Sequence, residues 1–369
     1  MSSSSFQFKD TIITKTSAPK SSEGLPPYSN TDHMVEIDWT VADGWTAPRI
    51  VPYAPLALDP TASCLHYATQ CFEGLKAFRS QDGKSLRLLR PELNLARLNV
   101  SAERASLPTF DADELLKVLV KLLSIDGHFV QPGSFVYIRP YLIGTMTGLG
   151  VCAPTSVKLG IVMVLMPSWS DKPLRLYSSN PKDAVRAWPG GFGSSKLGAN
   201  YGPTLREHSI AQKDGYDQVL WLFGEEERLV TEAGASNFVA VWKNAKSGAV
   251  EVVTCSLETN LILPGINRRS AIEYLRAENK TVLETKFSID DLDKAAEEGR
   301  LLEAFAIGTA FFVAPVKEIR TPEGKSVSVP LPSLEDGSIA LELRKHFSGL
   351  MYDNYTEAHP WVVVIPKDN

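Results

Sequence analysis

One lysine lies in a segment that is rich in glycine. Residues 187–202 read AWPGGFGSSKLGANYG, so glycines surround both Lys196 and Tyr201. Glycine lets the backbone turn tightly and approach a ligand closely, at a cost in folding entropy. A lysine amine becomes nucleophilic when burial or nearby cations lower its pKa, and it can then form a Schiff base with a carbonyl compound. The segment therefore indicates lysine chemistry or a phosphate-binding turn.

A nucleotide-binding loop is the first alternative. That motif requires Gly directly before the lysine and Ser or Thr directly after it, where this chain has Ser195 and Leu197. An ordinary glycine-rich turn with a solvated lysine is also consistent with the segment. The residues next to Lys196 thus disfavour a nucleotide-binding protein, but they do not by themselves select lysine chemistry.

An acidic residue and a helix start add to this pattern. Glu232 lies in VTEAGASNF, directly before an apolar strand, where an isolated glutamate is more often exposed. Residues 263–270, LPGINRRS, place a Pro-Gly turn before a pattern of helical period. The free amides of Ile266 and Asn267 would then lie at a helix N-terminus and could bind an anion. An ordinary helix start fits this second motif about equally well.

Together these motifs resemble the branched-chain amino acid aminotransferases, which are pyridoxal 5'-phosphate (PLP) enzymes of fold type IV. Residues 196–203, KLGANYGP, resemble the cofactor-lysine motif of that family, and the resemblance extends from about Asp32 to the last strand. It implies that Lys196 forms the Schiff base and acts as general base. It also implies that Glu232 pairs with the protonated ring nitrogen of PLP, the electron sink of the reaction. The other implied cofactor contacts are Arg97, Tyr201, Ile266, Asn267 and Thr309.

The resemblance also implies the substrates and a partner subunit. The amino acids would be L-leucine, L-isoleucine and L-valine, with 2-oxoglutarate and glutamate as the other pair. An aromatic wall with few polar groups suits a branched side chain, because recognition there is mostly apolar burial. The family implies a homodimer in which one loop reaches the pocket of the partner. The implied substrate-facing residues are Tyr67, Phe72, Tyr137, Arg139, Leu149, Val151, Ala235 and Ala310.

Two positions depart from the family pattern. Asn30 stands where many relatives have an aromatic residue, and Ala235 stands at the position of a common threonine. A pathway-specific paralogue therefore stays open. Another fold-type IV activity, such as D-amino acid or R-selective amine transamination or aminodeoxychorismate lyase, would keep the cofactor motifs. The segments FEG at 72–74 and YIR at 137–139 argue against it. The retained cofactor residues likewise argue against a non-catalytic PLP-binding role.

The elements that must position these residues follow from hydrophobic period and turn signals. Strands are predicted at 34–39, 49–58, 74–79, 85–89, 134–143, 157–166, 218–223, 237–242, 303–316 and 361–365, and helices at 91–105, 111–127, 266–277 and 333–347. The strand at 303–316 is expected to be interrupted at Gly308 and Thr309. This order predicts an α+β fold, because it is neither regularly βαβ nor all-β. The resemblance implies a small N-terminal domain and a larger domain that carries the lysine. We expect a flexible tail over residues 1–30, the small domain over 31–170 and the PLP-binding domain over 171–369, joined by a linker at 168–173.

Composition bears on other classes of protein. The chain has 369 residues, 44% of them hydrophobic, and a net charge of -5, which implies no general attraction to nucleic acid or anionic membranes. No apolar run reaches the ~18 residues of a membrane helix. The four cysteines lack metal-ligand spacing, so no metal site is expected. No Arg precedes Arg49, which predicts a cytoplasmic protein, with a weak mitochondrial signal as the alternative.

Overall fold

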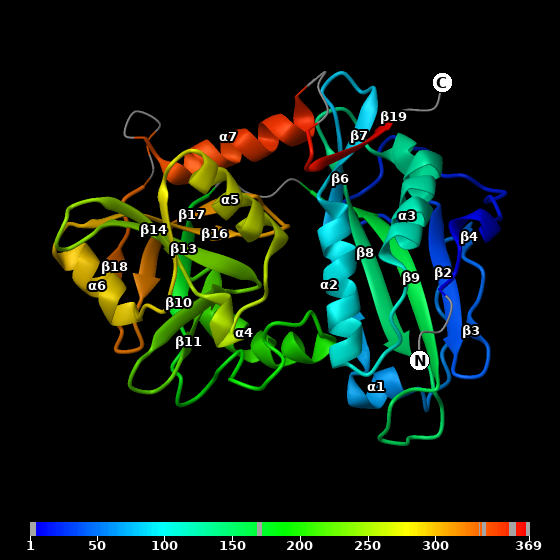
Figure 1. Cartoon of the computed structure of the whole chain (residues 1–369), viewed down its shortest axis with the longest axis horizontal. Coiled ribbons are helices and arrows are strands. Elements are labelled where there is room, and N and C mark those ends of the chain that lie inside the picture. Colours follow the sequence, from blue (N-terminus) through cyan, green and yellow to red (C-terminus); the bar gives the residue numbers. More distant parts are fainter. Residues whose placement is uncertain (1–4, 168–171, 332, 334–336, 354–358, 367–369) are drawn as a thin grey trace. The chain divides into compact units, whose positions relative to one another are not determined.

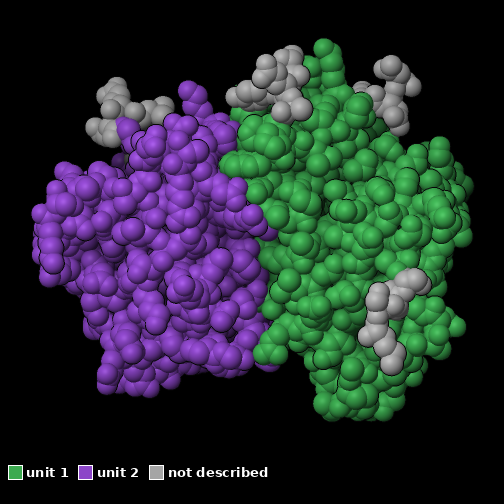
Figure 2. Space-filling model, viewed as in Figure 1, with its two compact units in different colours: residues 1–168, 195–199, 348–369 green, residues 169–194, 200–347 purple. Residues whose placement is uncertain are grey.

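The computed structural model describes residues 5–167, 172–331, 333, 337–353 and 359–366. The chain divides into two compact units, which Figure 2 shows in different colours. Unit 1 comprises residues 1–168, 195–199 and 348–369, and unit 2 comprises residues 169–194 and 200–347. By its contacts Lys196 belongs to unit 1, although the chain before and after its segment belongs to unit 2.

The predicted domain limits stay a prediction, and the compact units differ from them. Residues 195–199 and 348–369 group with unit 1 and not with the predicted larger domain. Strand pairing is the physical reason, since Leu197 forms an antiparallel bridge with Cys71 and the last strand joins the sheet of unit 1. Residues 168–171 of the predicted linker lie outside the described residues.

Unit 1 contains a ten-stranded sheet with the order β1-β4-β2-β9-β8-β6-β7-β19, to which β3 and β5 add by pairing with β2 and β8 (Figure 1). In β8 the buried positions Val136, Ile138 and Pro140 alternate with half-buried ones, as expected for a strand with two different faces. The strands are β1 (Ile12–Ile13), β2 (His33–Thr40), β3 (Gly44–Trp45), β4 (Arg49–Pro52), β5 (Gln70–Phe72), β6 (Leu75–Arg79), β7 (Ser85–Leu89), β8 (Phe135–Gly144), β9 (Ser156–Leu165) and β19 (Val362–Pro366).

Three α-helices belong to unit 1: α1 (Ser63–Tyr67), α2 (Pro91–Arg104) and α3 (Ala112–Asp126). Proline occupies the first turn of α2, where its missing N–H costs no hydrogen bond. The Asp111 side chain accepts hydrogen bonds from the Asp113 and Glu114 amides and so caps α3. Figure 1 shows α2 and α3 side by side, and they pack on each other.

The N-terminal residues that the structure describes are packed against unit 1. Phe6 is 4% exposed, stacks on Phe110 and meets Trp45 edge-on. The Thr16 amide donates to His33 Nε2 over 3.0 Å, and β1 pairs with β4. One aromatic anchor and a short strand therefore hold residues 5–20, although this segment is polar in composition. The predicted flexible tail over residues 1–30 stays a prediction.

Unit 2 contains a nine-stranded sheet with the order β12-β11-β10-β17-β16-β13-β14-β15, and β18 pairs with β17. An additional pairing between β12 and β13 closes β10, β11, β12, β13, β16 and β17 into a barrel, which removes the edges of that part of the sheet. The strands are β10 (Leu174–Ser178), β11 (Gln218–Phe223), β12 (Leu229–Ala233), β13 (Ser236–Lys243), β14 (Val250–Thr254), β15 (Thr281–Glu284), β16 (Leu301–Ile307), β17 (Val313–Arg320) and β18 (Ser326–Ser328).

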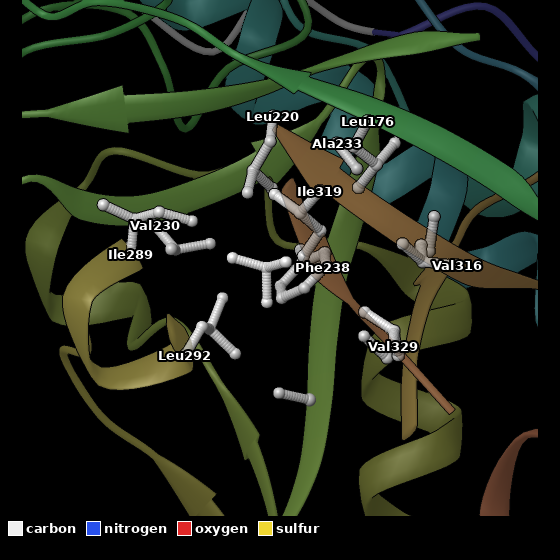
Figure 3. Packing of buried hydrophobic residues seen from close by; sticks show 14 of the residues in the cluster. Leu176, Leu220, Val230, Ala233, Phe238, Ile289, Leu292, Val316, Ile319 and Val329 are labelled. Atoms are coloured by element: carbon white, nitrogen blue, oxygen red, sulfur yellow. The ribbon is translucent and has the colours of Figure 1, made fainter. Parts of the chain in front are cut away.

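Apolar side chains of different strands meet inside the barrel. Leu176, Leu220, Phe238 and Val316 belong to one buried cluster, and Figure 3 shows them beside the side chains that α6 (Ile289–Glu297) contributes. Ser288 and Asp291 form a capping box at the start of α6. The barrel is therefore a packed core and not a channel.

The remaining helices of unit 2 are α4 (Leu205–Lys213), α5 (Ile266–Ala277) and the start of α7 (Ile339–Tyr352). Residues 334–336 of the predicted helix at 333–347 lie outside the described residues. The helix α7 starts at Ile339, where Glu303 accepts hydrogen bonds from Ser338 Oγ and from the amides of Ile339 and Ala340. Short 3-10 helices lie at Phe8–Asp10, Gly127–Phe129, Gly198–Asn200, Gly202–Thr204 and Leu257–Thr259. Among the described residues, no helix combines the length and apolar character needed to span a membrane.

Candidate active site

Lys196 is fixed within unit 1 by its main chain. Its carbonyl accepts a hydrogen bond from the Phe72 amide over 3.1 Å, and its amide donates to Ser101 Oγ over 2.9 Å. The Lys196 Nζ lies 4.9 Å from the centre of the Phe72 ring. Gly198 packs closely on Gln70: a Cβ at position 198 would lie 2.8 Å from Gln70 Nε2 in the side-chain amide. The glycine-rich sequence thus allows the close approach that sets the lysine against an aromatic ring.

Phe72, Tyr137 and Arg139, three of the predicted substrate-facing residues, lie together in unit 1. The Arg139 guanidinium carbon lies 4.6 Å from the Phe72 ring centre, and Arg139 Nη2 donates to Tyr137 Oη over 3.1 Å. A Cβ on Gly74 would lie 2.0 Å from Tyr137 Oη, so only glycine fits beneath this hydroxyl. Within the described residues, the buried Arg139 Nε has no hydrogen-bond partner. This wall therefore combines aromatic rings with one cation.

Tyr67, Leu149 and Val151 form a second group in unit 1. The Tyr67 hydroxyl donates to the Leu149 carbonyl over 2.6 Å, which ties α1 to the loop that follows β8. Leu149 has a positive φ of 58°, and Val151 is 83% exposed. The loop that carries the predicted residues Leu149 and Val151 is thus tied to α1 at one end and exposed at Val151.

Arg97 is engaged by a carboxylate that the sequence prediction omits. Arg97 Nε lies 2.6 Å from Glu73 Oε1, and Arg97 Nη2 and Asn94 Nδ2 donate to Oε2 over 3.0 and 2.9 Å. Burial alone would raise the pKa of Glu73, but Arg97, Lys196 and the Asn94 amide hold it below its ordinary value. The assignment of Arg97 to a phosphate stays a prediction. The one available signal for Glu73 is an acid within the apolar segment CFEGLKAF.

Glu232 in unit 2 is held by three donors. Arg186 Nε lies 2.9 Å from Oε2, while the Leu263 amide and Asn237 Nδ2 donate to Oε1 over 2.8 and 3.1 Å. The side chains of Glu232, Arg186 and Asn237 are all buried. Charge-assisted hydrogen bonds of this kind favour the ionised carboxylate. The sequence prediction names Glu232 but misses its partners Arg186 and Asn237.

The Pro-Gly turn leads into α5 as predicted, and no side chain caps this N-terminus. Asn267 Nδ2 donates to the Gly308 carbonyl over 2.7 Å, which joins the start of α5 to the turn between β16 and β17. Thr309 and Ala310 lie half-buried in that turn. The first amides of α5, including those of Ile266 and Asn267, are therefore positioned for an anion beside this turn.

Gly265 allows this turn to pack on the residues around Glu232. A Cβ at Gly265 would lie 2.0 Å from Asn237 Oδ1, while its φ of -66° is open to any residue. Gly265→Ala should therefore displace Asn237 and destabilise the protein by about 1–3 kcal/mol. Urea unfolding measures this loss. Gly248→Ala is a poor comparison because its φ is positive, whereas Gly202→Ala, with open space around its Cβ, is the matched control.

Tyr201 and Ala235 line one cavity of unit 2, with a volume of about 200 Å³. Arg186 and His208 line the same cavity. Because Arg186 is the ion-pair partner of Glu232, this ion pair lies at the wall of the cavity. Among the described residues there is no cluster of His, Cys, Asp and Glu able to hold a metal ion.

The sequence as a whole matches known aminotransferases. Residues 70–319 match the family model described as amino-transferase class IV. The cytosolic branched-chain-amino-acid aminotransferase of Saccharomyces cerevisiae is 40% identical over 98% of this chain and 97% of its own length. The chain belongs to the branched-chain amino acid aminotransferase family.

Other members of the branched-chain aminotransferase family are similarly related. The mitochondrial enzyme of Rattus norvegicus is 40% identical over 90% of this chain and 84% of its own length. The solved T.th. enzyme, in complex with N-(5'-phosphopyridoxyl)-L-glutamate, has a TM-score of 0.68 and 23% identity over 89% of this chain and 97% of its own. This likeness confirms the predicted fold type IV.

Proposed function

We propose that this protein is a PLP-dependent branched-chain amino acid transaminase. It transfers the amino group of L-leucine, L-isoleucine or L-valine to 2-oxoglutarate and releases the branched 2-oxo acid and L-glutamate. The observation that carries this proposal is the 40% identity to a branched-chain aminotransferase over 98% of the chain. The position of Lys196 against Phe72, with Arg139 on the same ring, supports it.

The side chains present fit PLP. When bound, PLP supplies an electron sink for the negative charge that develops at the substrate Cα. The buried Glu232 carboxylate suits a protonated ring nitrogen, and the uncapped amides at the start of α5 suit a phosphate. We assign Arg97 and Thr309 to the phosphate as well, and Tyr201 to the 3'-oxygen of the ring.

Lys196 has two tasks in this proposal. Its Nζ would hold the cofactor, and as general base it would take the proton from the substrate Cα. Because the main chain of Lys196 is bound to Phe72 and Ser101, the amine can leave and return without movement of its backbone. We assign the substrate carboxylate to the backbone amides near Ala235 and Ala310.

One pocket must accept both an aliphatic and an acidic side chain. Phe72 and Tyr137 provide apolar surface for leucine, and the Arg139 guanidinium is available to a second carboxylate. Arg139→Leu should raise the KM for 2-oxoglutarate and glutamate about tenfold or more, since charge-assisted hydrogen bonds are worth about 1.5–3 kcal/mol. The KM for leucine, measured by steady-state kinetics, should change about threefold at most.

Arg206→Leu is the control for this change, because the Arg206 side chain is 77% exposed and lies in α4. Equal losses for leucine and glutamate in Arg139→Leu would remove the selective role of Arg139.

We also propose a homodimer located in the cytosol. The exposed Leu149 and Val151 support a loop that contacts the partner's pocket, and the related yeast enzyme is cytosolic. Light scattering of Val151→Asp tests the assembly, since a charge in an apolar interface should weaken it. Imaging of the tagged full chain tests the compartment, for which the related rat enzyme makes the mitochondrion the alternative.

The absorption spectrum tests the activity directly. The purified, PLP-loaded protein should show a visible band that L-leucine converts to the near-ultraviolet band of pyridoxamine phosphate, with no oxo acid present. Conversion by D-amino acids or amines alone would point to another fold-type IV enzyme. The lack of any visible band after PLP is added would contradict the role of Lys196.

A further inference from the structure

One face of α2 carries polar side chains that are buried. Asn94, Arg97 and Ser101 follow at spacings of three and four residues, so they lie in one row along the helix, and each is at most 8% exposed. Ser101 Oγ accepts the hydrogen bond of the Lys196 amide, while Asn94 and Arg97 donate to Glu73. The same helix face therefore holds both the lysine segment and the carboxylate.

Glu73 occupies the fully buried end of this arrangement. It is 0% exposed, and its Oε2 also accepts from the Gly74 amide over 3.1 Å. Its main-chain amide donates to the Pro140 carbonyl of β8, which prevents the residue from turning away. Because this carboxylate is fully buried, its charge acts on its neighbours with little screening by solvent.

Lys196 faces charges of both signs in unit 1. Arg139 of β8 shares the Phe72 ring with it, and Arg97 of α2 lies on Glu73, so two cations oppose the protonated form of the amine. The other titratable groups on β5 and β8 are Cys71, Tyr137 and Tyr141. Burial raises the pKa of the Cys71 thiol and of the Tyr141 hydroxyl to about 12, which keeps both neutral. Glu73 supplies the opposing negative charge.

We propose that Glu73 is a positioning residue of the transamination reaction, a buried counter-ion that stabilises the protonated state of the nitrogen of Lys196 and fixes Arg97. For the PLP-loaded enzyme this inference rests on the proposed function, whereas for the PLP-free protein it does not. After Lys196 Nζ has taken the substrate proton it carries a positive charge, and Glu73 stabilises that charge without touching the substrate.

The electrostatics of Glu73 agree with this role. Burial raises the pKa of Glu73, but Arg97 and then Lys196 lower it below its ordinary value. Such coupling is reciprocal: a lysine cation that stabilises the ionised carboxylate is itself stabilised by it. Without the charge of Glu73, the neighbouring charges that remain are the cations Arg97 and Arg139.

A pH titration of the PLP-loaded enzyme tests this inference. The visible absorption of lysine-bound PLP reports whether the lysine nitrogen is protonated. In Glu73→Gln the midpoint of that titration should fall by about one pH unit, because the substitution removes a negative charge that interacts with Lys196. Glu303→Gln, a substitution of another buried carboxylate with three donors, should leave the midpoint unchanged.

An unchanged midpoint in folded, PLP-loaded Glu73→Gln would overturn the inference, whatever its turnover rate. If Glu73→Gln does not fold, Glu73→Asp keeps the charge but withdraws it by one methylene, and a fall in the midpoint is again required.

The PLP-free protein separates this inference from the proposed function. NMR titration of the ¹³C-methylated Lys196 amine, identified by its loss in Lys196→Arg, must show the same downward shift in Glu73→Gln even if the wild-type protein shows no transamination.

Discussion

Lys196→Ala is expected to reduce transamination of L-leucine about 10⁴-fold or more and to remove the visible absorption of bound PLP. The loss is this large because, in the proposed function, one nitrogen serves as both the covalent attachment and the general base. The fold should tolerate the change. Lys196 contacts Phe72 and Ser101 through main-chain atoms, which alanine keeps, and its own side chain is only half-buried.

Stopped-flow absorbance with L-leucine measures the half-reaction without the second substrate. Lys182→Ala is the matched control, because it also removes a lysine side chain, but one that is 67% exposed. Lys182 belongs to unit 2, as does the chain just before the glycine-rich segment. Partial rescue of Lys196→Ala by added methylamine would support the general-base role. A variant that transaminates at the wild-type rate would exclude Lys196 as the cofactor lysine.

Local patterns predict the fold best where an element is long and periodic. The helices at 91–105 and 111–127 and the strands at 134–143 and 157–166 are confirmed within one or two residues as α2, α3, β8 and β9. Short elements with little period escape prediction, such as β10 (Leu174–Ser178) and α6. The predicted strand at 49–58 ends at Pro52, since the chain there leaves the sheet beside further prolines.

Barrel closure is a further feature that local patterns miss. It depends on two residue pairs between β12 and β13, Glu232 with Asn237 and Ala233 with Ser236. These pairs follow from a tight turn at Gly234, which has a φ of 59°. Hydrophobic period specifies which strands form, but the partners of each strand depend on distant segments of the chain. The same turn places Glu232 beside Asn237, so closure of the barrel also builds part of the site.

Motif resemblance names the side chains that would touch PLP, and it misses those that hold them. Glu73 and its partner Arg97 are 24 positions apart, and each by itself is an ordinary charged residue of the sequence. Arg186 is likewise one arginine among many until its bond to Glu232 is seen. Because the free energy of a buried charge depends on its partner, a single sequence does not reveal which charges are buried.

Glu232→Ala should slow proton abstraction from the substrate by about 10²–10⁴-fold while PLP still binds through Lys196. Without the carboxylate, the ring nitrogen of PLP loses the partner that keeps it protonated, and its capacity to take up electrons falls. The change also leaves Arg186, which is 7% exposed, as a buried cation without its anion. A loss of about 3–5 kcal/mol in the free energy of unfolding is therefore expected as well.

Stability and chemistry can be separated for Glu232 by a matched buried carboxylate. Glu303 is 7% exposed and accepts three hydrogen bonds at the start of α7, so Glu303→Ala should destabilise unit 2 without slowing the half-reaction. Deuterium at the leucine Cα provides the second measurement. If Glu232 acts on proton abstraction, the isotope effect on the half-reaction should rise in Glu232→Ala, because that step then limits the rate. A wild-type rate and isotope effect in a folded, PLP-loaded Glu232→Ala would show that the carboxylate serves only to neutralise Arg186.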